Sequence, residues 1–154
     1  MTAGLALLNR DRGGPNLRLQ CLAIPELDDR LETTSMTMFT DTPLWNQANA
    51  IDSWKFYLSA DTRVDGRNGQ PYAAPGRATD LTGLPPAYVS VCEFDLLRDE
   101  GLVYAQRLLQ AGVSTEVHHY PGTFHGASAI RGVAVSERMI ADEHAALYRA
   151  LHPR

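Results

Sequence analysis

Two short stretches constrain the fold of this chain most, because each joins a β-branched run to a polar turn and then to a helical pattern. The first stretch is 93–101 and the second is 120–126. Strands separated by helices of this kind form a parallel sheet with right-handed crossovers. Polar groups gather on the loops that leave the carboxyl ends of such strands. Asp95 and His125, one on each loop, are therefore the candidate site residues.

Length and charge exclude several classes of protein. A chain of 154 residues is one domain by length and can bury a sizeable core. The net charge of -4, with no run of Lys or Arg, argues against a nucleic-acid partner. No apolar stretch is long enough to span a membrane, and the first residues lack the pattern of a signal peptide. We expect a cytoplasmic protein without a membrane partner.

The hydrophobic periodicity predicts an α/β fold with a three-stranded parallel sheet, its strands in chain order and flanked by helices. Residues 1–154 are read as a single domain, in which residues 25–75 form a long excursion with a cap-like or pocket region. The helix in this excursion should start at Thr42-Pro43, a capping residue followed by proline. The predicted helices are 3–12, 42–58, 99–111 and 135–151, and the predicted strands are 17–24, 87–91 and 114–120.

Several spaced motifs carry a resemblance to one family. They are 4–8, 28–33, 41–45, 72–75, 84–87, 95–101 and 120–126. In order and separation they resemble the C-terminal half of a hormone-sensitive-lipase-like carboxylesterase (family IV) of the α/β-hydrolase superfamily. The resemblance covers the chain from about Ala3 onward, with departures at Leu96, where the family usually has proline, and at Ala127, where it often has an aromatic residue.

The resemblance implies that Asp95 is the acid and His125 the base of a Ser-His-Asp triad. The alternative is that Asp95 only favours a helix N-terminus through the helix dipole, but Asp99 and Glu100 already fill that place. The alternative for His125 is a purely structural role, as a turn histidine in a glycine-rich loop. From the residues alone the two readings of His125 are even, and the resemblance favours the triad.

The third triad member is missing from these residues. No G-x-S-x-G elbow occurs in the sequence, and the resemblance implies that Met1 falls a few residues after that motif. It also implies that the His-Gly-Gly-Gly oxyanion loop, the N-terminal cap helices and the first strands of the family are absent. Ser128 is the alternative nucleophile because it lies close to His125 in sequence, whereas Ser114 begins a strand. Neither serine has a glycine two residues after it.

A metal site and a cofactor are not expected. His118 and His119 are adjacent on a strand and point to opposite faces, so they cannot ligate one ion together. Cys21 and Cys92 read as buried free thiols.

Four aromatic residues gather in the region of the predicted helix 42–58. They could form the wall of a substrate pocket, although packing of an amphipathic helix on the domain is the better explanation for most of them. They are Trp45, Trp54, Phe56 and Tyr57.

Two classes of function remain. In the first, the chain is a carboxylic-ester hydrolase type that acts on a small-molecule ester but is inactive alone, because it lacks its nucleophile. In the second, it is a non-catalytic half-domain or assembly module that needs a partner supplying the N-terminal half. Strand 17–24 has an unpaired edge in either case, with only Arg18 to protect it. We therefore expect a homodimer, or a complex with a complementary half, across this strand or across helices 3–12 and 43–58.

Overall fold

The three predicted strands are present in a computed structural model of the chain, which describes residues 1–58 and 71–153. Within the described residues, helices and strands follow one another, with short 3₁₀ turns at Pro75–Arg77 and Ala127–Ala129. The helices are α1 (Thr2–Asp11), α2 (Thr34–Met38), α3 (Gln47–Leu58), α4 (Arg98–Gln110) and α5 (Ala134–Leu151), and the strands are β1 (Gln20–Ala23), β2 (Ala87–Phe94) and β3 (Thr115–Phe124).

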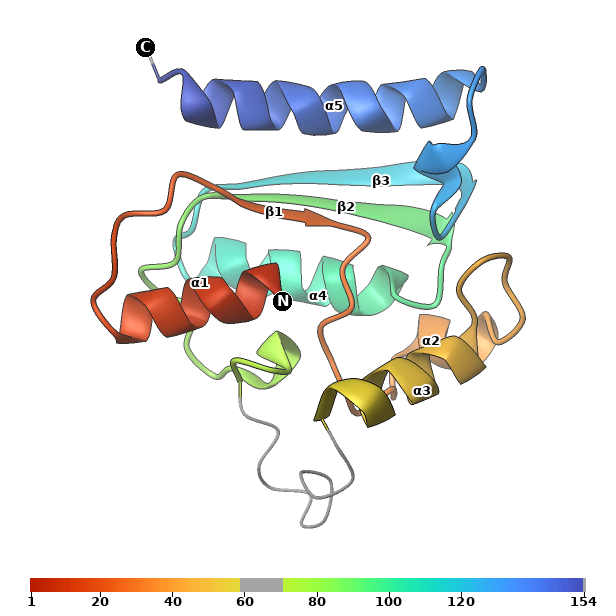
Figure 1. Ribbon diagram of the computed structural model, residues 1–154, viewed down its shortest axis with the longest axis horizontal. Coiled ribbons are helices and arrows are strands. Elements are labelled where there is room, and N and C mark those ends of the chain that lie inside the picture. Colours follow the sequence, from red (N-terminus) through yellow and green to blue (C-terminus); the bar gives the residue numbers. More distant parts are fainter. Residues whose placement is uncertain (59–70, 154) are drawn as a thin grey trace.

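The strands form one parallel sheet in the order β1-β2-β3, which confirms the predicted topology. Leu22 of β1 lies opposite Val89 of β2, and Val89 lies opposite Val117 of β3. Helix α5 crosses one face of the sheet, whereas α1 and α4 cover the other (Figure 1). Helices α2 and α3 lie at the end of the sheet where β2 finishes (Figure 1).

The central strand organises the core. Residues 87–92 of β2 are all buried, as expected for a strand covered on both faces. Val89 and Val91 point toward α1 and α4 and join the main apolar cluster with Leu7, Tyr104 and Leu108. On the opposite face, Cys92 packs with Tyr120, Ala127 and Met139 of α5. Because successive side chains of a strand point to opposite faces, β2 contributes to the apolar clusters on both faces of the sheet.

The structure corrects several predicted boundaries. Strand β1 begins at Gln20, not at residue 17, because Pro15 and the exposed Arg18 precede the first pairing with β2. Both other strands run further than predicted, to Phe94 and Phe124. Within the excursion, residues 34–38 form a helix that the sequence pattern did not reveal.

Helix α3 begins five residues later than Thr42. The Thr42 hydroxyl donates to the carbonyl of Trp45, and Leu44 has a φ of +66°, so residues 42–45 form a turn. Asn46 and Asn49 cap the helix reciprocally, since the side chain of each accepts the backbone N–H of the other at 3.1 Å.

The hydrophobic pattern of the predicted helices also places five apolar side chains inward, but the structure leaves them exposed. They are Leu5, Phe56, Leu109, Ile140 and Leu151. The sequence also predicts a loop over residues 61–85, part of which lies outside the described residues. Among the described helices, none has the length and apolar character needed to cross a membrane.

Gly4 tests the packing of α1. A Cβ at this buried position would lie 1.8 Å from the carbonyl oxygen of Tyr72, a backbone atom that cannot rotate away. We therefore expect Gly4→Ala to lower the free energy of unfolding by about 1–3 kcal/mol, despite the better helix propensity of alanine. Gln106→Ala on the exposed face of α4 is the control and should change stability by less than about 0.5 kcal/mol. Equal stability of Gly4→Ala and wild type in urea titrations would contradict this packing.

Candidate active site

Asp95 and His125 are brought together by the ends of β2 and β3. The ladder pairs Cys92 with Tyr120 and then Phe94 with Phe124, so β3 carries two extra residues between the two pairs. Because Phe94 lies opposite Phe124, the residues that follow them, Asp95 and His125, lie next to each other. A regular register would instead place Thr123 opposite Asp95.

Local chemistry holds the two extra residues of β3. Gly122 has a φ of +73°, a conformation that favours glycine. Its N–H donates to the carboxylate of Glu93 at 2.6 Å, and the Thr123 hydroxyl donates to the carbonyl of Tyr120 at 2.6 Å. The Pro121-Gly122-Thr123 sequence thus forms a bulge that shifts the following histidine forward.

The pair itself is an oriented acid and base. Nδ1 of His125 lies 2.9 Å from Oδ2 of Asp95 and donates to it. Asp95 is 1% exposed, and its other oxygen accepts the N–H of Leu97 at 2.9 Å. Since Nδ1 carries the proton, Nε2 of His125 is left as the acceptor. This is the arrangement in which a carboxylate fixes the tautomer of a general base.

A second side of the histidine is held by an aromatic ring. Trp45 stacks on His125 with ring centroids 5.7 Å apart and an interplanar angle of 28°. Trp45 is the member of the predicted aromatic set that contacts the site. Phe56, by contrast, is 87% exposed and contributes nothing to it.

The turn that carries Asp95 is anchored by α2. The hydroxyl of Ser35 donates to the carbonyl of Leu96 at 2.8 Å, and its backbone N–H donates to Asp99 at 2.8 Å. Met36 packs on Leu96 and Leu97 in a small buried cluster. Asp99 was expected only to favour the N-terminus of α4, but it also fastens α2 to this turn.

The candidate nucleophiles lie in different places. Ser128 is in the 3₁₀ turn that follows Gly126, and among the described residues it has no hydrogen bond to His125. The carbonyl of Ser114 accepts the N–H of Ala87, so Ser114 is at the opposite end of the sheet. Burial raises the pKa of the Cys21 and Cys92 thiols to about 11, so neither supplies a thiolate at neutral pH. No cluster of three metal-ligating side chains occurs in the described part of the chain.

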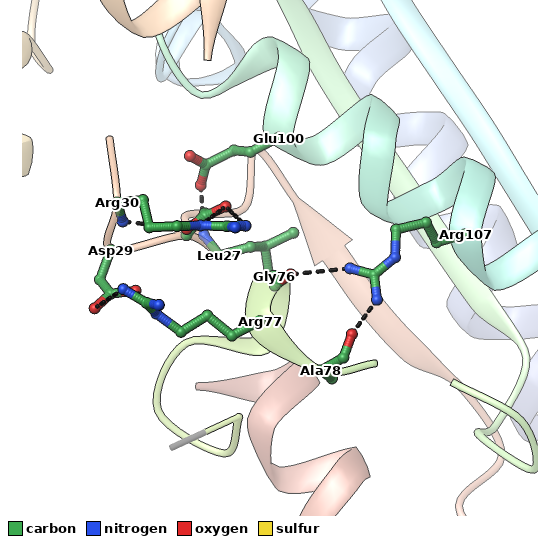
Figure 2. A network of polar contacts seen from close by, with 9 residues as sticks. Leu27, Asp29, Arg30, Gly76, Arg77, Ala78, Glu100 and Arg107 are labelled. Atoms are coloured by element: carbon green, nitrogen blue, oxygen red, sulfur yellow. Dashed lines mark hydrogen bonds and ion pairs between the residues drawn. The ribbon is translucent and has the colours of Figure 1, made fainter. Parts of the chain in front are cut away.

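A network of charged groups joins the loop that follows β1 to α4 and to the 3₁₀ turn Pro75–Arg77 (Figure 2). Asp29 accepts from Arg77 at 2.5 Å, which joins this loop to the 3₁₀ turn Pro75–Arg77. Arg107 of α4 donates to the carbonyls of Gly76 and Ala78. The network therefore ties two loops to α4.

Glu100 is the buried member of this network. It is 4% exposed, and its carboxylate accepts the N–H of Leu27 at 2.5 Å. Burial, with smaller contributions from the charges of Glu26 and Asp28, raises the pKa of Glu100 to about 8. Sequence reasoning placed Glu100 only at the start of a helix, and no pattern in the sequence marks it as buried.

With this geometry in place, the chain can be compared with known proteins. The sequence profile of a family described as "alpha/beta hydrolase fold" matches residues 1–129. The chain belongs to this α/β-hydrolase family. Its curated relatives include carboxylesterase NlhH of Mycobacterium tuberculosis, which is 36% identical over 99% of this chain and 48% of the relative. Esterase LipI of the same organism is 35% identical over 86% of this chain and 41% of the relative.

Solved structures agree. A bacterial heroin esterase matches with a TM-score of 0.94 and 56% identity, over 97% of this chain and 48% of that chain. Esterase LipW from Mycobacterium marinum matches with a TM-score of 0.87 and 39% identity, over 98% of this chain and 46% of that chain. These matches place the chain among the hormone-sensitive-lipase-like (family IV) hydrolases. It spans about half the length of the relatives that it matches.

The buried Glu100 predicts a distinctive pH dependence of stability. Its pKa is about 8 in the folded chain against an ordinary value of 4.5, so the fold favours the protonated form. The resulting stabilisation is complete below pH 4.5 and is lost as the pH rises through about 8. Relative to Glu100→Gln, wild type should lose of the order of 1 kcal/mol of unfolding free energy per pH unit within this window.

Chemical denaturation at several pH values between these limits measures the difference. Glu137→Gln, at an exposed position of α5, is the control and should run parallel to wild type. Parallel profiles for wild type and Glu100→Gln would show that Glu100 does not hold a proton in the fold.

Proposed function

We propose that this chain carries the acid and base of a carboxylic-ester hydrolase and is inactive until a nucleophile is supplied from outside these residues. The observation that supports this most is the 2.9 Å contact between His125 and the buried Asp95. The stacked Trp45 and the anchored turn around Leu96 hold both groups in one orientation. Such a preorganised pair is the part of a triad that sets proton transfer.

The chemistry of each residue follows from its place. Nε2 of His125 would accept the hydroxyl proton of an attacking serine and later return it to the leaving alcohol. Asp95 would hold the tautomer and stabilise the imidazolium that forms in between. Acyl transfer also needs an activated hydroxyl and donors for the oxyanion, and the sequence contains no G-x-S-x-G elbow. A small-molecule ester is the substrate class that this machinery fits.

The activity of the isolated chain tests the first half of this proposal. Purified protein should hydrolyse a short-chain p-nitrophenyl ester no faster than a His125→Ala variant, because the base has no nucleophile to deprotonate. Esterase-like turnover that a serine-reactive phosphonate blocks and His125→Ala abolishes would overturn it. Ser128→Ala would then show whether that serine is the nucleophile.

Complementation tests the second half. A fragment of a 36% identical relative that carries its own G-x-S-x-G elbow should restore hydrolysis when mixed with this chain. The restored rate should fall roughly 10³–10⁴-fold with Asp95→Asn, which keeps the shape but loses the preferred tautomer. Restoration that survives His125→Ala would show that the pair does not act as proposed.

A second candidate function, an assembly module, is favoured by the outer edge of β1. The N–H of Gln20 donates to the carbonyl of Pro86, just before β2, and the N–H of Ile24 donates to the carbonyl of Ser90 in β2, both at 2.8 Å. The backbone groups of Cys21 and Ala23 therefore point away from β2. No described residue pairs with this edge. An unpaired, nearly uncharged edge invites another strand, whereas β3 at the other side of the sheet is protected by its bulge and by Pro121.

We expect the isolated chain to form a homodimer across this edge, or a complex with a complementary half-domain. Ala23→Lys should convert the dimer to monomer, because a charge at this exposed position opposes pairing without touching the ladder to β2. Lys at the exposed Gln106 is the control and should leave the dimer intact. A clean monomer of 16.9 kDa for wild type, in size-exclusion chromatography with light scattering at micromolar concentration, would contradict the prediction.

A further inference from the structure

A cavity of about 360 Å³ lies beyond the end of β1. Its walls come from the first turn of α1, from residues 21–27, from α3 and from Ala73. Neither Asp95 nor His125 lines it. The cavity is therefore a separate space, next to the acid–base pair rather than part of it.

One wall of the cavity holds a carboxylate without a cationic partner. Glu26 is partly buried, and its Oε1 accepts from the hydroxyl of Ser53 at 2.9 Å. None of the ion pairs among the described residues includes Glu26. His125 and the amino group of Met1 act on it only through space, while burial raises its pKa. A partly desolvated carboxylate is stabilised by a positive charge.

Two aromatic rings of α3 form the adjoining wall. Trp54 and Tyr57 both line the cavity, and their rings meet edge to face with centroids 6.0 Å apart and an interplanar angle of 62°. Trp54 is 5% exposed, and its Nε1 has no hydrogen-bond partner among the described residues. An aromatic corner beside a carboxylate is the environment that attracts alkylated ammonium groups, through cation–π and charge attraction together.

The alternatives fit the same walls less well. An anion would be repelled by Glu26, and a purely aliphatic group would further desolvate that carboxylate without pairing it. A bare metal ion would find one carboxylate and no second acidic ligand on the cavity wall. An alkylammonium group satisfies the carboxylate and the rings at once.

We propose that this cavity binds the tertiary or quaternary ammonium group of a small organic cation. Glu26 lies three residues after the end of β1, and Trp45, the ring stacked on His125, lies two residues before the start of α3. A bound cation would thus lie beside the acid–base pair. The assignment of the cation to an ester substrate rests on the proposed function, whereas the binding of the cation does not.

Choline and 3,3-dimethylbutan-1-ol are matched probes, because they share size and shape and differ in the charged nitrogen. Each is titrated into ¹⁵N-labelled chain while the indole N–H signal of Trp54 is followed. Choline should bind with a dissociation constant in the millimolar range and shift this signal. The dissociation constant of the neutral alcohol should be higher by roughly fivefold or more. Glu26→Gln should reduce choline binding to the level of the alcohol.

Two further variants keep the test decisive. Glu137→Gln, on the exposed side of α5, removes a carboxylate that does not line the cavity and should leave choline binding unchanged. Tyr57→Leu, at a half-exposed position, should weaken the binding of choline at least twofold and the binding of the alcohol by less. This variant keeps the test valid even if Glu26→Gln perturbs the fold. Equal binding of both probes, no binding of choline, or unchanged binding in Glu26→Gln and Tyr57→Leu would overturn the proposal. None of these readouts depends on ester hydrolysis.

Discussion

The two extra residues in β3 are the constraint on which the candidate site depends. Without them the ladder would set Thr123 opposite Asp95 and leave His125 beyond reach. The bulge is stable because Gly122 tolerates its positive φ and because the Glu93 carboxylate accepts the N–H that the irregular turn exposes. Glu93 lies on β2, one residue before the pair Phe94–Phe124, so the two strands fix their own offset.

The rest of the fold keeps the acid side of the pair rigid. Asp95 is enclosed by the N-terminal turn of α4, and Ser35 of α2 fastens this turn from outside. The charged network under the loop after β1 secures the neighbouring segment in the same way, through Glu100 and Arg107 of α4. One helix therefore supports both loops, and a small site is held by contacts distributed over residues far apart in sequence.

The sequence predicted what depends on local pattern. Buried β-branched runs indicated the sheet, and the residues after them indicated Asp95 and His125. It did not predict the bulge, because Pro121-Gly122-Thr123 reads equally well as the turn after a shorter strand. The capping by Asn46 and Asn49 was missed because Thr42-Pro43 is the stronger helix-start signal in isolation. Glu26 and Glu100 were missed because burial of a carboxylate is a tertiary property that no periodicity encodes.

The order of the strands places Asp95 and His125 close to the loop that follows β1. Asp95 follows the central strand and His125 follows β3, so the hydrogen bond between them turns the imidazole back toward β2. Neighbouring strands lie about 4.8 Å apart, which places the end of β1 roughly one strand spacing beyond Asp95. Burial raises the pKa of Glu26, the second residue after Ile24 at that end, and His125 is near enough to oppose this effect through space. His125 therefore lies within electrostatic range of the loop that follows β1. A parallel strand added to the outer edge of β1 would deliver its own following loop to the same end of the sheet, so the proposed assembly surface and the proposed site both follow from one strand order.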